Sequence, residues 1–478
     1  MWDRVVYIKG LCFTYLNVPL LLFLSNPKRN VVTSTTPSCE LENNNLGLHE
    51  VSYKYKPSIK TEFVEWFVGI SEAESNFLCR VRKNNGIVTG FEFVFRITLH
   101  KDDKSALELI KATLGCGRLN LERDTLVFTI SQLSDIENIL IPLFEQFPLN
   151  TTKYIDYLAF KKAFFMFVNR KRGKLNKEDL YSKIILLKNS MNNKRVIYDL
   201  PVGHRIRITG NYLVGLLEGN GSFYLNKQDM TGRVSFVTTT SNKVLLKKIR
   251  EFFLNDLDES SCILGSCTKL INIIDKKIKG DNKPISVLEI YQVDYLCNIL
   301  IPYFDRLQFR TKKYMDYMDF RTIAFLTLEG KYLTEKGKEL IIKLGDTMNN
   351  NRLSTNSNQL ILDITTKSEL DILIKSKPLI YVDSEGRAII IKERKYIRST
   401  YIIKAIFYKD FTSYYTNGVS CAKALHVSNN TITQRLNDGK PVKNKEGLIS
   451  ALTVKRIKAY SPKDSVYNFS TTALLPNF

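Results

Sequence analysis

Two stretches decide the fold, FTISQLSDIENILIPLFEQFPLNTTKYIDYLAF at residues 128–160 and LEIYQVDYLCNILIPYFDRLQFRTKKYMDYMDF at residues 288–320. They align without a gap, and about 14 of the 33 aligned positions are identical. Each copy carries N-I-L-I-P-x-F followed by T-x-K-Y-x-D-Y in the same register. Self-similarity over this length indicates two domains of one ancestry in a single chain. We place these domains at residues 58–200 and 201–348.

The same order of expected elements surrounds each copy. The first repeat begins with a helical pattern over residues 65–73, and the second with one over residues 212–219. Strand-like runs follow directly, and residues 91–99 alternate apolar with mostly polar side chains, which is typical of a strand with one buried face. The first repeat continues with a helix over 102–114, a strand pair over 120–130 and helices over 134–146 and 153–168. This mixture predicts an α+β fold.

The charge balance indicates a polyanionic partner. The chain of 478 residues has 70 Lys+Arg against 48 Asp+Glu, a formal net charge of +22. An excess of this size favours nucleic acid. Anionic lipid is the competing partner class, but no sustained amphipathic Lys/Arg helix is evident, so we expect no membrane partner. The four histidines lie far apart and the eight cysteines form no C-x-x-C pair, so any metal chemistry should rest on carboxylates.

Residues 1–57 form an N-terminal extension with a short apolar segment at residues 11–24. The apolar segment is too short to span a bilayer comfortably, and a proline and an asparagine interrupt it. Three interpretations stay open: a signal or anchor remnant, a fragment inherited from an upstream membrane-protein exon, or an ordinary buried segment.

The two helical patterns at the start of the repeats share one motif. It reads FVGISEAESNF at residues 67–77 and LVGLLEGNGSF at residues 213–223, with small residues at the third and seventh positions and an acid at the sixth. Small residues four apart lie on one helix face and allow two helix backbones to approach closely. The residues expected at such a contact are Gly69, Ala73, Gly215 and Gly219.

The eighth positions of the motif are the candidates for chemistry. If the two helices pack together, their C-terminal ends lie side by side and bring Glu74 close to Asn220. Two acidic groups at such a point could bind divalent cations through oxygen and activate water for phosphodiester hydrolysis. Glu74 taken alone would be a solvated helix-end carboxylate, but its place in a repeated motif favours a functional role.

The motif and the repeat resemble the LAGLIDADG homing endonuclease family in its single-chain, two-repeat form, over about residues 58–348. The resemblance implies a monomer of two αββαββα repeats about a pseudo-twofold axis. It also implies a β-saddle in the major groove of double-stranded DNA and cleavage across the minor groove with Mg²⁺ or Mn²⁺. Glu74 would be the metal-binding carboxylate of the first half, and Lys153 and Lys313 of the T-x-K motif would lie near the scissile phosphates. Taken alone, these two would be surface lysines.

Asn220 departs from the family pattern, which expects an acid at this position. An amide oxygen can ligate a cation, but it adds no charge to hold the cation. Glu218 is no easy substitute, because residues two apart on a helix face nearly opposite ways. Weak cleavage, nicking of one strand or pure binding therefore stay open beside double-strand cleavage that promotes intron mobility. The alternative function is that of an RNA maturase, which assists group I intron splicing without cleavage.

Polar side chains on the expected strands suggest a groove-reading surface, although a merely solvated face is the competing interpretation. The basic residues expected to contact DNA there are Arg80, Arg82, Arg96 and Arg233.

The C-terminal part is expected to form a separate unit. We expect a linker at residues 349–400 and a small module at 401–478, in which residues 419–439 read as a helix-turn-helix. This stretch resembles the modules appended to organellar homing endonucleases; a short helical hairpin with only a packing role is the alternative. By the same resemblance, the Asn-, Lys- and Ile-rich composition fits an AT-rich mitochondrial genome. The residues expected to reach DNA from the second helix are Asn429, Asn430, Thr433 and Gln434.

Overall fold

The structure is a computed structural model that describes most of the chain beyond the N-terminal extension. The described residues are 59–171, 175–255, 257, 271–277, 283–383, 387–399, 401–408, 411–415 and 417–458. The extension at residues 1–57, with its apolar segment, lies outside them. Over the described ranges, the helices are too short or too polar to cross a bilayer.

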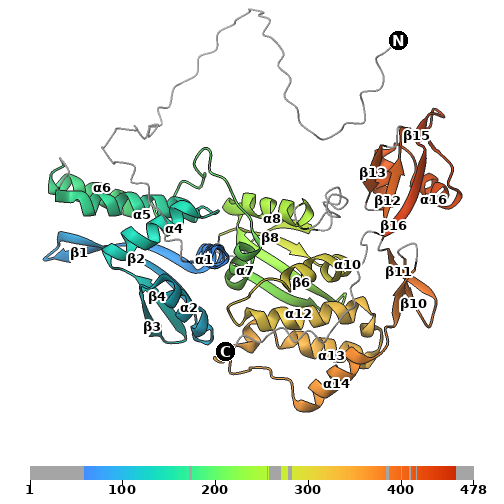
Figure 1. The fold of residues 1–478 in the computed structure, drawn as a ribbon, viewed down its shortest axis with the longest axis horizontal. Helices are drawn as coiled ribbons and strands as arrows, with labels where there is room; N and C mark the ends of the chain where they lie inside the picture. Colours follow the sequence, from blue (N-terminus) through green and yellow to red (C-terminus); the bar gives the residue numbers. More distant parts are fainter. Residues whose placement is uncertain are drawn as a thin grey trace, which may run out of the picture. The chain divides into compact units, whose positions relative to one another are not determined.

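The first half is an αββαββα unit with a further helix. Its four strands form one antiparallel sheet in the order β1-β2-β4-β3 (Figure 1). The main elements are α1 (Thr61–Glu74), β1 (Ser75–Asn84), β2 (Ile87–His100), α2 (Lys104–Leu114), β3 (Arg118–Glu122), β4 (Thr125–Ile130), α4 (Ile141–Gln146), α5 (Lys153–Val168) and α6 (Lys177–Asn189).

The second half repeats this order. Its sheet has the order β5-β6-β8-β7, also antiparallel (Figure 1). The predicted α+β class with two αββαββα repeats is therefore confirmed. The main elements are α7 (Gly210–Asn220), β5 (Gly221–Asn226), β6 (Thr231–Thr239), α8 (Lys243–Asn255), β7 (Ile271–Lys276), β8 (Ile285–Ile290), α11 (Ile301–Phe304), α12 (Lys313–Leu328) and α13 (Glu335–Asp346).

Alternation along β2 builds the core of the first half. Phe91, Phe93 and Phe95 are buried and point to the same face of the strand. Phe93 packs edge-on against Phe160 of α5, with ring centroids 5.6 Å apart. The buried apolar residues of the two halves belong to one continuous cluster, so the helices and sheets of both halves share one core.

The helix that ends in each N-I-L-I-P motif is not regular. A π-helical segment, Ile136–Leu140 in the first half and Leu296–Leu300 in the second, comes directly before α4 and α11. The proline of each motif, Pro142 or Pro302, cannot donate a backbone hydrogen bond to the preceding turn, and the wider turn falls just before it. Sequence periodicity predicted an uninterrupted helix over 134–146, because it does not detect this local widening.

The expected linker at residues 349–400 is instead folded. Asn349–Arg352 is a 3-10 turn that bonds back to the second half, as described below. A helix and a small antiparallel sheet follow, and the order of the sheet is β11-β10-β9. These elements are α14 (Ile364–Lys375), β9 (Ile380–Val382), β10 (Arg387–Ile390) and β11 (Lys395–Ser399).

A buried lysine fixes this segment to the second half. Lys331 is only 1% exposed, and its Nζ donates to the carbonyl and hydroxyl oxygens of Ser376 and, over 3.0 Å, to the carbonyl of Lys377. Glu329 is the carboxylate beside it, at 3.4 Å. Because a buried ammonium left without partners would cost several kcal/mol, the chain at residues 376–377 is held at this point.

The C-terminal module has a core of its own. Two helices, α15 (Gly418–Ala424) and α16 (Asn429–Asp438), pack on each other and on strands that the sequence did not reveal. Ser428 caps α16 by accepting from the amide of Thr431 at 3.1 Å, as its type and position predicted. The strands are β12 (Tyr401–Ile406), β13 (Thr412–Tyr415), β14 (Val442–Lys443), β15 (Ile449–Ala451) and β16 (Thr453–Lys458).

Candidate active site

Helices α1 and α7 touch through their backbones, and Gly69 and Gly215 are the points of contact. A Cβ added at Gly69 would lie 2.2 Å from the carbonyl oxygen of Tyr212, and one added at Gly215 would lie 2.2 Å from that of Trp66. No residue larger than glycine fits at such a distance. The two contacts are equivalent under the repeat, so they are related by the pseudo-twofold axis.

This packing sets the position of Glu74, the last residue of α1. A Cβ added at Gly219 of α7 would lie 2.2 Å from the Cβ of Ala73 and 3.2 Å from Oε1 of Glu74. The carboxylate therefore lies against the partner helix. Burial raises the pKa of Glu74, while the positive charges of Lys153 and Lys313 oppose the increase. The structure thus brings together the carboxylate and both lysines of the T-x-K motifs.

Asn220, the last residue of α7, is exposed and lines a pocket of about 220 Å³ between the halves. Lys153, Thr152, Asn242 and Arg195 line the same pocket. The remaining wall mixes hydroxyl groups with apolar side chains and includes one acid and one further lysine. The pocket therefore carries cationic side chains on a mixed wall, and cationic side chains are what a position occupied by a backbone phosphate would require.

The acids at the sixth position, Glu72 and Glu218, serve another purpose. Each is buried and accepts from the turn that precedes the lysine-bearing helix of its own half, α5 or α12. Glu218 accepts from the amides of Arg310 and Thr311 over 2.6 Å and from the indole N–H of Trp66. Glu72 accepts from the amide and hydroxyl of Thr151 in the same way. Burial raises the pKa of Glu218 to about 7. Glu218 is thus fully engaged, in agreement with the expectation that it cannot replace an acid at position 220.

Lys153 is a partly buried cation. Its Nζ donates to two carbonyl oxygens at the end of α1, those of Ser71 at 2.9 Å and Ser75 at 2.6 Å. The carbonyl of Ser71 also accepts from the backbone N–H and the hydroxyl of Ser75. Burial lowers the pKa of Lys153 to about 8, and Glu72 and Glu74 act in the opposite direction. The ammonium therefore stays mostly protonated at neutral pH, with one N–H left for a substrate oxygen.

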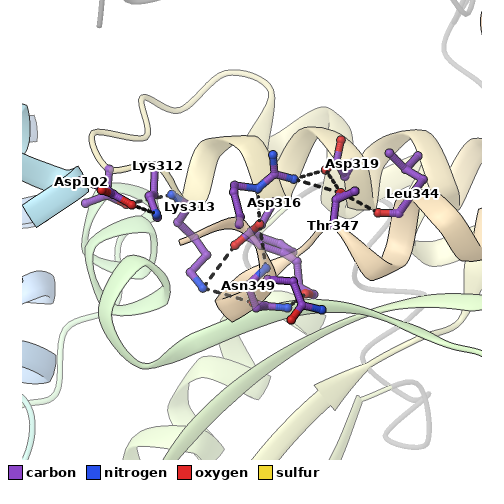
Figure 2. Close-up of polar contacts among 12 residues, drawn as sticks. Asp102, Lys312, Lys313, Asp316, Asp319, Leu344, Thr347 and Asn349 are labelled. Atoms are coloured by element: carbon purple, nitrogen blue, oxygen red, sulfur yellow. Dashed lines mark hydrogen bonds and ion pairs between the residues drawn. The ribbon is translucent and has the colours of Figure 1, made fainter. Parts of the chain in front are cut away.

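Lys313 has different partners. Figure 2 shows its Nζ directed at Asp316 and Asn349, with separations of 3.5 Å to Oδ2 of Asp316 and 3.3 Å to Oδ1 of Asn349. Arg352 reaches the other oxygen of Asp316 at 2.9 Å. The two lysines are equivalent in sequence but unequal in surroundings, since one is bonded to main-chain carbonyls and the other to a carboxylate and an amide.

The network around Asp316 has a counterpart in the first half that sequence analysis missed. Asn192 donates its backbone N–H to the carboxylate of Asp156 at 2.9 Å, as Asn349 does to that of Asp316 at 3.0 Å. Both asparagines have a positive φ, 58°. The signal was present in the sequence as M-N-N-K-R at residues 191–195 and M-N-N-N-R at residues 348–352. This second, shorter repeat shows that residues 349–352 belong to the second half and not to a linker.

The matched family model now settles the relationship. Residues 67–164 and 213–324 match the model described as LAGLIDADG endonuclease. This chain belongs to the LAGLIDADG endonuclease family. The matched ranges include the T-x-K motifs of the two repeats, and neither reaches the C-terminal module.

Curated relatives of this LAGLIDADG protein are encoded in fungi. The "Uncharacterized mitochondrial protein RF1" of Saccharomyces cerevisiae is 26% identical over 306 residues, which cover 62% of this chain and 61% of that protein. The "Probable intron-encoded endonuclease 2" of Neurospora crassa is 25% identical over 308 residues, covering 59% and 64%. The chain thus spans about three fifths of the length of these relatives.

Solved structures share the fold of the two LAGLIDADG repeats. The I-LtrWI homing endonuclease bound to target DNA has a TM-score of 0.50 and 23% identity, over 61% of this chain and 98% of that chain. The I-CpaMI meganuclease bound to uncleaved DNA has a TM-score of 0.50 and 24% identity, over 60% and 99%. Likeness at this identity concerns the fold.

The four strand arginines that the sequence predicted as DNA contacts differ in whether they already form ion pairs within the protein. Arg80 and Arg82 are exposed, and Arg80 has Glu92 as a distant neighbour at 3.9 Å. Arg96 is paired with Glu122 at 3.1 Å. Arg233 is only 15% exposed, is paired with Glu289 at 2.9 Å and stacks over a tyrosine ring. Arg80 and Arg82 thus stay available for phosphates, whereas Arg233 would have to leave existing partners.

In the C-terminal module, the four side chains expected to reach DNA are exposed. Thr433 uses its hydroxyl to bond the carbonyl of Asn429 at 3.1 Å, one turn earlier. A role for this helix in DNA contact stays a prediction. The exposed side chains are Asn429, Asn430, Thr433 and Gln434.

Proposed function

We propose that this LAGLIDADG protein is a site-specific homing endonuclease that hydrolyses phosphodiester bonds of double-stranded DNA with Mg²⁺ or Mn²⁺. The observation that carries the proposal is the backbone contact of α1 with α7, which holds Glu74 against the partner helix with Lys153 and Lys313 acting on it. A carboxylate and two ammonium groups at a pseudo-twofold axis suit a substrate whose two strands are themselves related by a twofold axis.

The oxygen ligands at the ends of α1 and α7 are too few to bind a hard cation without further ligands from the substrate. Glu74 offers a carboxylate and Asn220 an amide oxygen, and within the described ranges no three His, Cys, Asp or Glu residues gather into a metal site. Mg²⁺ commonly takes one or two carboxylates and completes its shell with substrate phosphate oxygens and water. Glu74 and Asn220 would hold the ion. Its chemistry would be to polarise the scissile phosphate and to lower the pKa of a bound water.

The side chains of the protein orient and neutralise the substrate. Lys153 is fixed by two carbonyls at the end of α1, so its remaining N–H has little freedom, and the residue lines the same pocket as Asn220. A preorganised cation of this kind stabilises charge that develops on a phosphate oxygen without reorganising during the reaction. Lys313 is held less firmly, by Asp316 and Asn349.

These inequalities favour cleavage of one strand over the other. The first half contributes an acid and a firmly held lysine, and the second half contributes an amide and a lysine already paired with a carboxylate. We therefore propose that nicking is faster than double-strand cleavage. The relatives with mitochondrial and intron-encoded names support a mitochondrial setting and a role in intron or reading-frame mobility.

The deciding experiment compares Glu74→Gln with Glu62→Gln on the same helix. Glu62 is exposed in the first turn of α1, so its substitution controls for the lost charge alone. Purified protein is incubated with supercoiled plasmids that carry AT-rich organellar DNA, with and without Mg²⁺. Nicking that needs Mg²⁺, survives Glu62→Gln and is lost in Glu74→Gln is expected. Nicking that survives Glu74→Gln would remove this carboxylate from the mechanism.

An RNA maturase is the alternative that Asn220 keeps open. Protein that binds group I intron RNA tightly and never nicks any plasmid, even with Asn220 changed to Asp, would replace the endonuclease proposal. The exposed asparagine and glutamine side chains of α16 favour the first proposal, because a helix of this kind fits the major groove of B-form DNA better than the deep, narrow groove of RNA.

A further inference from the structure

Each half of the molecule accepts a hydrogen bond from the turn that precedes the lysine of the other half. In the first half, the 3-10 turn Lys101–Asp103 precedes α2, and Asp103 accepts from the amide of Lys312 at 2.8 Å. In the second half, the 3-10 turn Thr240–Asn242 precedes α8, and Asn242 accepts from the amide of Thr152 at 2.8 Å. The two bonds have equal length, involve equivalent positions and cross between the halves in opposite directions.

The two residues that donate these bonds, Thr152 and Lys312, come directly before Lys153 and Lys313, at the first turns of α5 and α12. The residues one step earlier, Thr151 and Thr311, are held from their own half by the buried acids at the sixth motif position. Each lysine-bearing turn is thus fixed from two sides, once by its own half and once by the opposite half. Arg195 also donates to the carbonyl of Thr152, so removal of one anchor loosens the turn without freeing it.

The crossed bond lies at the candidate active site and not at a remote surface. Asn242 and Thr152 line the same 220 Å³ pocket as Lys153 and Asn220. A shift of about 1 Å in a group that contacts the reacting phosphate can slow a reaction by up to two orders of magnitude.

We propose that Asn242 and Asp103 are positioning residues, each of which orients the lysine of the opposite half, so that cleavage of each strand depends on a residue from the other half. This proposal rests on the proposed endonuclease function. Neither residue needs a negative charge for this role, because the carbonyl oxygen of an amide accepts the same bond. Asn242 already acts through an amide.

The bonds of Asp103 and Asn242 differ in the further contacts that lie beside them. Lys312 also forms an ion pair with Asp102, and Ser354 donates its amide to Asp102 at 2.9 Å. In the other half the equivalent positions are occupied by the uncharged Ser241 and Thr152. Removal of Asp103 therefore leaves the contacts of Asp102 on its turn, and removal of Asn242 leaves the two bonds that the side chain of Asn150 exchanges with the backbone of Arg207. We expect the larger effect from Asn242→Ala, because Asp102 still holds Lys312 itself, whereas the bonds to Arg207 hold residue 150 and not Thr152.

The test uses target DNA with a different label on each strand. Lys153→Met and Lys313→Met first identify which strand depends on which lysine. Asn242→Ala is expected to slow the Lys153-dependent strand about tenfold, the effect of one lost hydrogen bond on a fixed group, without changing the dissociation constant for DNA in Ca²⁺. Asp103→Ala is expected to slow only the Lys313-dependent strand. Slowing of the opposite strand, or of both strands equally, would overturn the proposal.

Conservative variants separate positioning from charge. Asp103→Asn keeps the acceptor and should cleave within about twofold of wild type, a difference below the value of one hydrogen bond. If Asp103→Asn is as slow as Asp103→Ala, the negative charge of Asp103 is what cleavage requires, and the proposed positioning role is wrong. The same logic predicts that Asn242→Asp cleaves much faster than Asn242→Ala.

Hydrogen exchange of the free protein gives a readout that needs no cleavage. Peptides that contain the amide of Thr152 should exchange faster in Asn242→Ala, and those that contain the amide of Lys312 should exchange faster in Asp103→Ala, with the rest of the protein unchanged. Unchanged exchange at these amides would show that the crossed bonds are absent. Faster exchange in a protein that never cleaves DNA would instead locate the failure in the proposed endonuclease function.

Discussion

Substitution of Gly215 by alanine tests the helix contact on which the candidate active site depends. The added Cβ would lie 2.2 Å from the carbonyl oxygen of Trp66 and 2.8 Å from the amide nitrogen of Ile70. Ordinary contact of a Cβ begins at 3.4 Å. The atoms in the way belong to the main chain of α1, so no side chain can rotate aside, and the helices must separate by about 1 Å.

The expected loss of stability follows from two opposing effects. Overpacking of a tight core costs about 3 kcal/mol at the upper end of its usual range. Alanine is favoured over glycine within a helix by about 1 kcal/mol, which offsets part of this loss. We expect a net loss of about 2 kcal/mol in the free energy of unfolding, equivalent to a fall of roughly 4–8 °C in Tm for a domain of this size.

Urea and thermal unfolding followed by circular dichroism would measure this change. Gly90→Ala is the matched control, because a Cβ added there meets no atom within 4 Å, and we expect a change within about 0.5 kcal/mol. The double variant Gly69→Ala with Gly215→Ala should cost less than the sum of the two, since one separation of the helices relieves both clashes. If Gly215→Ala raised Tm, as helix propensity alone predicts, the backbone contact would be refuted.

Three further predictions concern charge, pH and DNA contact. Asn220→Asp supplies the missing carboxylate, so it should convert nicked plasmid product into linear product, and an unchanged ratio on a gel would show that position 220 does not limit the second cut. Because burial raises the pKa of Glu218 to about 7, the folded protein binds more protons than the unfolded chain between about pH 4.5 and pH 7, and its stability should fall over this range by on the order of 3 kcal/mol. In Glu218→Gln this contribution is absent, so urea midpoints of the two proteins that run parallel between pH 5 and pH 7.5 would contradict the assignment. Asn430→Ala with Gln434→Ala should leave Tm unchanged and weaken binding to long targets about tenfold, the discrimination of one good base contact, and gel-shift affinities equal to wild type would mean that α16 does not touch DNA.

The sequence was sufficient for the features that repeat over a long stretch. The two copies of N-I-L-I-P-x-F and T-x-K-Y gave the two domains, and the small residues of the motif gave the helix contact, because backbone approach requires residues of that size. The family assignment followed from the same residues. These predictions depend on local patterns, which are visible without knowledge of distant partners.

Other features depend on partners that are far apart in the chain. Taken alone, Lys153 would be a surface lysine, yet it is partly buried, because its ammonium group donates to two carbonyl oxygens about eighty residues earlier in the chain. Asp103 was an ordinary residue before a helix, and only the structure shows Lys312 beside it. The M-N-N-x-R repeat could have been found in the sequence, but it lies beyond the longer alignment and is rich in the polar residues that predict a linker.

The buried contact of Lys331 with residues 376–377 sets the reach of the C-terminal module. The chain leaves the second half not as a free tether of fifty residues but from a fixed anchor, and a single residue, Thr400, separates β11 from β12. A short connection raises the effective concentration of a second binding element and restricts it to a narrow range of separations. If α16 binds DNA, it should therefore measure the spacing of its target as well as its composition. Insertion of a few base pairs between the central site and the flank would then remove its contribution without changing any contacted base.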